Sequence, residues 1–327
     1  MNSISKCQLA ALLLITDMFG LFCISGNMSV ETLYGVLAGT ALQLLAALVF
    51  AAKGGELSKL AAVFYLMYAL FCGGTVFSAL WRTSGAVYIP SESGNGIWGQ
   101  LMTAGLIALV CLYSSSTGIK PVARAAVIAA AAGIFCLGID FISAVFNAEW
   151  SNVTVPEKRS LAYEVLRGTA LSGGLGSLVV LSGAVKGERS GAFVWYFAAK
   201  AVVSSVLILT VLAVTGSIMD IPEFPVVTAA QLSQPFDAQR IDSLFLVIFA
   251  VFAVFSAALQ VMTGALLIKR IFPEFVRWRS TAVIVLTIGV ALLIWGRELL
   301  LVRASAAAAA LLVAPLGAKK SAAVSSG

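Results

Sequence analysis

Residues Gln8 to Ser25 read QLAALLLITDMFGLFCIS, an apolar segment whose only acidic residue, Asp17, lies near its centre. At about 1.5 Å of rise per residue, Asp17 is roughly 14 Å from Gln8, close to the middle of a hydrocarbon layer about 30 Å thick. A carboxylate at that depth costs about 3 kcal/mol on insertion scales, so it needs a cavity, a partner or a proton path. Gly20 follows Thr16 and Asp17 within one turn, and the pattern predicts a short helix interrupted at its middle.

The composition of the 327 residues indicates an integral membrane protein. Hydrophobic residues make up 60% and charged residues 11%, which leaves too little polar surface to cover a soluble globule. The apolar runs are continuous, unlike the alternating pattern of an outer-membrane barrel, and the length allows about ten spanning helices. We predict one polytopic all-α membrane domain over residues 1–327, surrounded by membrane lipid.

Several function classes are disfavoured by the residue types. The formal net charge is +6, but the basic residues gather at loop edges without interleaved aromatic residues, so no nucleic acid partner is expected. The sequence has no histidine, and its five cysteines show no paired spacing. We therefore expect no metal, no cofactor and no disulfide framework. No nucleophile has a base at useful spacing, so an enzyme is not expected.

The remaining apolar runs predict the other helices and their topology. An even helix count places both termini on one side of the membrane. Lys and Arg are more numerous in the loops on that side, which predicts that both termini are cytoplasmic and that loops 147–167 and 217–240 are outside. After the first helix, the predicted segments are 30–52, 60–81, 97–113, 121–146, 169–185, 193–216, 241–266, 281–295 and 300–316.

The sixth predicted helix resembles the first, because several glycines in residues 169–185 favour a broken backbone. The two helices hold corresponding places in two halves of five, and the halves enter the membrane from opposite sides. Paired interrupted helices indicate an inverted repeat with a binding site at the midplane. We predict a five-plus-five repeat of residues 8–146 and 161–316. Close helix packing is the alternative explanation for the glycines.

The two interruptions define a candidate ligand site. Freed amides at both breaks would accept a carboxylate, and Asp17 with carbonyl groups would face an ammonium group. On the eighth helix, a polar face would either line a cavity or form interhelical hydrogen bonds. Lys200, on the seventh, is predicted to extend toward the cytoplasmic interface. The candidate ligand-binding residues are Thr16, Asp17, Phe19, Gly20, Leu21, Gly173, Gly174, Gly176, Ser177, Ser256 and Gln260.

Two stretches resemble the endospore germination permeases, the B subunits of nutrient germinant receptors. PFDAQRIDSLFLVIFAVFAVFSAALQV, residues 235–261, looks like the eighth-helix signature of that family, and STGIKPVARAAVI, residues 116–128, is similar to its entry into helix 5. The family commonly carries an acidic residue at the break of helix 6. This chain departs from that pattern, because the sequence there is Gly174, Leu175, Gly176 and Ser177.

The resemblance implies membership of the amino acid, polyamine and cation transporter superfamily, with an inverted-repeat fold of the leucine-transporter type. It implies a receptor subunit of the spore inner membrane that binds a small nutrient such as an amino acid. Its partners would be an A-type membrane subunit and a C-type lipoprotein, and its action would be a ligand-coupled population shift. The alternatives are a proton-coupled amino acid transporter in which Asp17 carries the proton, and a scaffold subunit with a decayed pocket.

Overall fold

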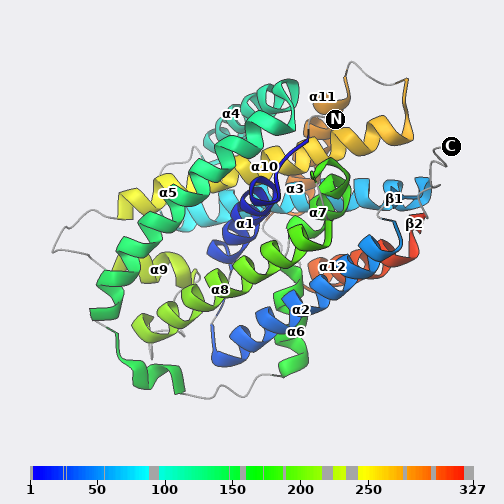
Figure 1. The fold of residues 1–327 in the computed structure, drawn as a ribbon. Helices are drawn as coiled ribbons and strands as arrows, with labels where there is room; N and C mark the ends of the chain where they lie inside the picture. The colour runs from blue at the N-terminus through cyan, green and yellow to red at the C-terminus, as the bar shows by residue number, and fades with distance from the viewer. Residues whose placement is uncertain are drawn as a thin grey trace.

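The chain is almost entirely helical wherever its structure is described, as the apolar runs predict (Figure 1). The structure is a computed structural model. It describes residues 3–24, 26, 28–54, 56–87, 96–146, 148–154, 160–171, 173–186, 189–215, 224–232, 242–274, 278–295 and 300–319.

The helices follow the predicted segments closely. The predictions 30–52 and 300–316 coincide with α2 and α12, and α9 lies in a stretch that was predicted to be a loop. The helices are α1 (Lys6–Phe22), α2 (Val30–Ala52), α3 (Lys59–Val87), α4 (Gly96–Thr117), α5 (Ile119–Phe146), α6 (Leu161–Ala170), α7 (Gly174–Leu181), α8 (Arg189–Thr215), α9 (Pro225–Leu232), α10 (Asp242–Ile271), α11 (Arg279–Leu293) and α12 (Leu300–Leu316).

The remaining regular elements are short. The 3₁₀ turns η1 (Trp150–Thr154) and η2 (Ser182–Ala184) precede α6 and follow α7. Strands β1 (Glu56–Leu57) and β2 (Ala318–Lys319) pair antiparallel, which joins the loop after α2 to the end of α12. The two helices lie side by side in Figure 1 and also contact each other directly.

Five helices are long and apolar enough to cross a membrane: α2, α3, α5, α8 and α10. The bent pair α6 and α7 could form a sixth span. Shorter apolar helices cover Met102–Thr117, α11 and α12. The described residues therefore form a multi-pass membrane protein, although fewer segments meet the length criterion for a span than the ten that were predicted.

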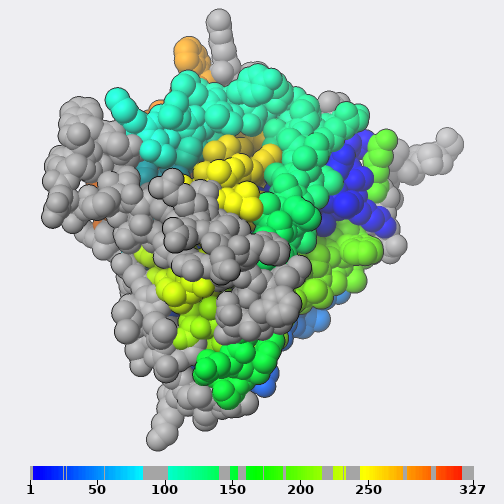
Figure 2. All heavy atoms as spheres, turned by 90° about the vertical axis from the view of Figure 1, so that its left-hand side faces the viewer, coloured from blue at the N-terminus to red at the C-terminus, as the bar shows by residue number. Residues whose placement is uncertain are grey.

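Most of the helices pack in two groups. One group consists of α1, α2, α8 and the α6/α7 pair, and the other of α3, α4, α10 and α11. Contact between α1 and α10 joins the groups. Helix α5 packs on α1, and α12 packs on α6 and α2. On the face shown in Figure 2, α10 is visible between α4 and α5, which both contact it.

The prediction that the first helix is interrupted is wrong. Helix α1 is continuous from Lys6 to Phe22, and a capping box between Ser5 and Gln8 fixes its start. Gly20 instead allows a neighbouring chain to approach, because a Cβ atom there would lie 2.9 Å from the carbonyl oxygen of Leu171. The glycine therefore reflects the contact with the end of α6 and does not break α1.

The prediction of a break in the sixth helix is confirmed. Helix α6 ends at Ala170, α7 begins at Gly174, and the two helices are bent by 52°. The first half begins at Leu161, however, inside the stretch that was predicted to be a polar loop. The break therefore separates two helices, α6 and α7, and Gly174 at the start of α7 contacts Asp17 in α1.

Candidate functional site

Asp17 lies at the break, with an exposed fraction of 4%. Its Oδ2 atom is 2.9 Å from Nζ of Lys200 and also accepts a hydrogen bond from the hydroxyl of Tyr196. Its Oδ1 atom accepts the amide proton of Gly174, with an N–O distance of 3.1 Å. Three donors from α7 and α8 therefore satisfy a carboxylate supplied by α1, which is what a buried charge requires.

Lys200 does not extend to the membrane interface as predicted. Its side chain is buried, with an exposed fraction of 3%, and Nζ also donates to Oε1 of Gln43 at 3.0 Å. Nε2 of Gln43 in turn donates to the carbonyl oxygen of Thr169 at 3.4 Å, in the last turn of α6. The nearby carboxylate of Asp17 compensates the ammonium charge inside the bundle, so the side chain has no need to reach water.

The start of α7 favours an anion. The first amides of a helix have no intrahelical acceptor and carry partial positive charge, so a carboxylate at Gly174 is stabilised there. Glycine at this position permits the approach. A Cβ atom on Gly174 would lie 3.0 Å from Oη of Tyr196 and 3.2 Å from Oδ1 of Asp17. The sequence predicted that the amide of Gly174 accepts a ligand carboxylate, and in this structure the amide donates to the carboxylate of Asp17 instead.

The polar face of α10 holds the other side of the break. Nε2 of Gln260 donates to the carbonyl oxygen of Gly173 at 2.9 Å, and Thr263 donates to Oγ of Ser177 at 2.9 Å. Ser256 is buried and donates to the carbonyl oxygen of Phe252, one turn earlier in its own helix. The polar face was expected either to line a cavity or to form interhelical hydrogen bonds, and Gln260 and Thr263 form such hydrogen bonds in this structure.

The other candidate residues of α1 have structural partners. Thr16 donates to the carbonyl oxygen of Leu12, and the ring of Phe19 lies 5.3 Å from that of Phe249. Leu21 is part of the hydrophobic core. The expectation that the amides of Phe19, Gly20 and Leu21 are free at a break is wrong, because these residues lie within the continuous helix α1.

Sequence reasoning missed Tyr196, Lys200 and Gln43 as site residues. A signal was present, since Tyr196 and Lys200 are spaced i, i+4 and so lie on one face of a helix. Asp17 and Lys200 also both fall within predicted membrane helices, where an acid and a base are natural partners. The sequence does not say which helices are neighbours, so it could not show that these residues meet.

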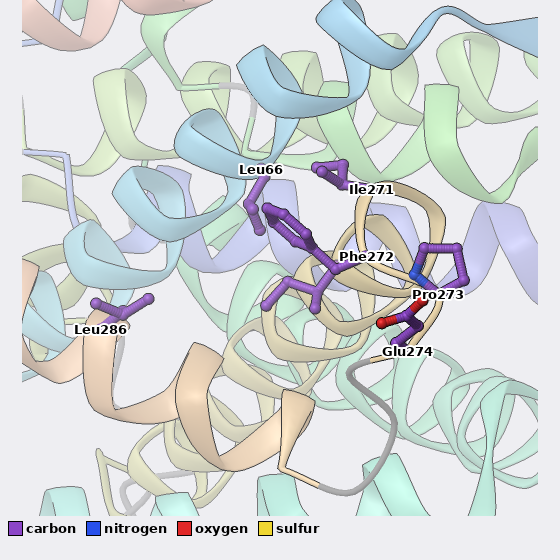
Figure 3. Close-up of a pocket in the computed structure, with 7 residues that line it drawn as sticks. Leu66, Ile271, Phe272, Pro273, Glu274 and Leu286 are labelled. Carbon is purple, nitrogen blue, oxygen red and sulfur yellow. The ribbon is translucent and has the colours of Figure 1, made fainter.

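A separate groove of about 780 Å³ lies at the end of α10 and is mainly apolar (Figure 3). The figure shows Phe272 beside Leu66, with Pro273 and Glu274 following the helix. None of the lining residues belongs to the Asp17 network. They are Leu66, Ile268, Ile271, Phe272, Pro273, Glu274 and Leu286.

Solved transporter structures share this fold. The chain is similar to Mhp1, a nucleobase-cation-symport-1 family transporter in a closed conformation with bromovinylhydantoin bound. The match covers 95% of this chain and 77% of that one, with 17% sequence identity and a TM-score of 0.61. The chain is also similar to MhsT in complex with L-phenylalanine. This match covers 97% of this chain and 88% of that one, with 12% sequence identity and a TM-score of 0.61. The sequence matches no protein-family model and no curated protein. The chain is therefore a multi-pass membrane protein with the leucine-transporter type of fold, and its structural neighbours are transporters rather than enzymes.

Proposed function

We propose that this chain binds a small polar nutrient, such as an amino acid, at the break between α6 and α7 and responds by changing conformation. The observation that carries this proposal is the buried ion pair of Asp17 and Lys200 at the first amide of α7. Burying two charges costs several kcal/mol per ion by typical estimates, and the pairing gives little net stability in return. A charge pair that joins α1, α7 and α8 at a helix break is well suited to a switch that a ligand operates.

The packing of the helices supports the predicted repeats, 8–146 and 161–316. In this scheme α1 to α5 correspond in order to α6/α7, α8, α10, α11 and α12. If each helix is exchanged for its counterpart, a contact in the structure should become another contact that also occurs. The contact of α2 with α6 becomes that of α8 with α1, and the contact of α3 with α11 becomes that of α10 with α4. The contact of α1 with α5 becomes that of α6 with α12. All six contacts occur. Two repeats related by a pseudo-two-fold axis give this kind of pairing.

The leading form of the proposal is a germinant receptor B subunit in the spore inner membrane, with A-type and C-type partner subunits. The resemblance of residues 116–128 and 235–261 to the germination permeases supports it, although residues 235–241 lie outside the described part of the chain. The fully satisfied Asp17 site also fits a receptor, because such a protein rests in one state until ligand shifts it. Adjacent genes for the two partner subunits would add support.

A proton-coupled amino acid transporter is the second candidate. It is favoured by the depth of Asp17 in the bundle and by the transporter identity of both structural neighbours. In this version the carboxylate of Asp17 takes up a proton, releases Lys200 and allows the helices to rearrange. Both candidates use the same site and differ in whether solute crosses the membrane.

Binding and uptake measured on the full chain separate the candidates. The purified protein in lipid nanodiscs is titrated with a panel of amino acids by calorimetry, and proteoliposomes are tested for uptake driven by a pH gradient. Binding without uptake supports the receptor. Uptake that Asp17→Asn abolishes, while Thr210→Ala retains it, supports the transporter. Neither binding nor uptake with any small polar solute would overturn the proposed function.

A further inference from the structure

Three hydrogen-bond donors converge on one point at the start of α7. They are the amide of Gly174, the hydroxyl of Tyr196 and the ammonium group of Lys200, and the carboxylate of Asp17 fills the space among them. The donors come from α7 and α8, whereas the acceptor comes from α1. The point of convergence is therefore an anion site whose occupant reaches it on a side chain from another helix.

We propose that these three donors form a carboxylate cradle in which Asp17 is a tethered occupant, and that the carboxylate of a small ligand replaces Asp17 there. This inference rests on the proposed function and names its ligand class, which is small solutes that carry a carboxylate. The conformation described here is then the self-occupied state of the site.

The cradle does not depend on Asp17 for its shape. Lys200 is also held by Gln43, whose amide is anchored to α6 through Thr169. The ring of Tyr196 packs against Phe197, with 4.6 Å between the ring centroids. The backbone just before the amide of Gly174 is fixed by the hydrogen bond from Gln260 to the carbonyl oxygen of Gly173. Donors held by groups outside the pair remain in place when the carboxylate leaves, which is the preorganisation that binding requires.

Charge balance narrows the ligand class further. The charges of Asp17 and Lys200 compensate each other, with Oδ2 of Asp17 2.9 Å from Nζ of Lys200. A zwitterion places its carboxylate on Lys200 and its ammonium group opposite the displaced Asp17, so the net charge is unchanged. A polyamine would leave excess positive charge in a buried region, which is costly. The cradle therefore favours zwitterionic amino acids over polyamines.

Removing the tethered carboxylate tests the cradle with a defined probe. Asp17→Ala leaves Lys200 without its buried counter-ion, and acetate is small enough to replace the lost group. We expect the melting temperature of Asp17→Ala to rise by about 2 °C or more with sodium acetate, but not with equal sodium chloride. The unmutated chain and the double variant Asp17→Ala/Lys200→Met should show no acetate-specific rise.

The proposal is overturned if acetate has no specific effect on Asp17→Ala, or if the double variant responds equally. Should Asp17→Ala be recovered poorly, the yield of monodisperse protein extracted with and without acetate gives the same comparison. The acetate test does not require the natural ligand, so its failure can be distinguished from a failure of the proposed function.

A second measurement keeps Asp17 in place and uses an amino acid that binds the unmutated chain. The carboxamide derivative of this amino acid lacks the carboxylate. It should bind at least roughly tenfold more weakly than the amino acid, because a charge-assisted hydrogen bond is lost. Lys200→Met should weaken binding of the parent amino acid to a similar extent, whereas Thr210→Ala should leave its affinity unchanged. Equal affinity for the amino acid and its amide would place the ligand's carboxylate outside the cradle, even if the protein binds nutrients as proposed.

Discussion

Gly176 of α7 and Tyr68 of α3 are in contact, and a Cβ atom added to the glycine would lie 2.8 Å from Cδ1 of the tyrosine ring. From the sequence, Gly176 was placed among the candidate ligand-binding residues. In the structure the ring of Tyr68 fills the space beside this glycine, and Tyr65 lies behind the ring at 3.6 Å from the same point. Close packing therefore explains Gly176, whereas at Gly174 the absent side chain admits Asp17 and Tyr196.

Substituting Gly176→Leu should lower the stability of the folded protein. Inserting a large side chain into a packed interior typically costs 1–3 kcal/mol, here about the upper end of that range because the neighbour is an aromatic ring. Scanning fluorimetry of the detergent-solubilised protein measures the change in melting temperature. The double variant Gly176→Leu/Tyr68→Ala should recover part of the loss. A Gly176→Leu protein of unchanged stability that no longer binds ligand would restore the view that a ligand fills this space.

Neutralising one member of the Asp17–Lys200 pair should destabilise the protein more than neutralising both. Asp17→Asn or Lys200→Met leaves an uncompensated buried charge, which typically costs about 3–5 kcal/mol. The double variant removes both charges and should be closer to the unmutated chain. Melting temperatures of the four proteins form a double-mutant cycle. Additive losses in that cycle would mean that the two side chains do not interact in the membrane.

The contact between α2 and α6 depends on glycine. A Cβ atom on Gly35 would lie 2.3 Å from the carbonyl oxygen of Glu164, which is backbone and cannot rotate away. Gly35→Ala should therefore separate the two helices and sharply reduce the yield of folded protein, measured by size-exclusion chromatography after extraction. The matched control is Gly105→Ala in α4, where nothing lies within 4 Å. Its stability should be unchanged or slightly higher, since alanine favours a helix.

Gly39 belongs to the same contact. It lies one turn after Gly35 in the predicted segment 30–52, where the sequence by itself gives no sign of a close contact. In the structure a Cβ atom there would lie 2.9 Å from the amide nitrogen of Thr169. Gly39→Ala should therefore behave like Gly35→Ala, and a fully stable Gly39→Ala protein would show that α2 and α6 are not held this closely.

The topology predicted from loop charges can be tested by cysteine labelling. Ser151 in η1 should be outside the cell membrane and Ser190, at the start of α8, inside. After the five native cysteines are replaced, an impermeant maleimide added to intact cells should label Ser151→Cys and spare Ser190→Cys. Labelling after permeabilisation is the control for accessibility. The opposite pattern would invert the orientation, and Ser233 in the other outer loop, which lies outside the described residues, offers an independent position.

The sequence alone determined the membrane class and most helix positions. A segment enters the bilayer when its local hydrophobicity outweighs the cost of its polar groups, and that quantity can be summed along the chain. For this reason the bounds of α2 and α12 were correct. The same reasoning marked Asp17 as a buried charge and the glycines around Gly174 as a break. These properties depend on neighbours in the sequence.

Only the tertiary structure decided which polar groups meet. The first seven residues of α6 fall in the polar stretch 147–167 that was predicted to be a loop, and this stretch includes Glu164 and Arg167. Both are buried in α6, however, where their side chains lie 3.5 Å apart. In the same way, Lys200 turns inward to Asp17, and Gly20 accommodates a carbonyl group of a distant segment. The cost of a buried charge or the need for a glycine depends on the group opposite it, and long-range packing supplies that group.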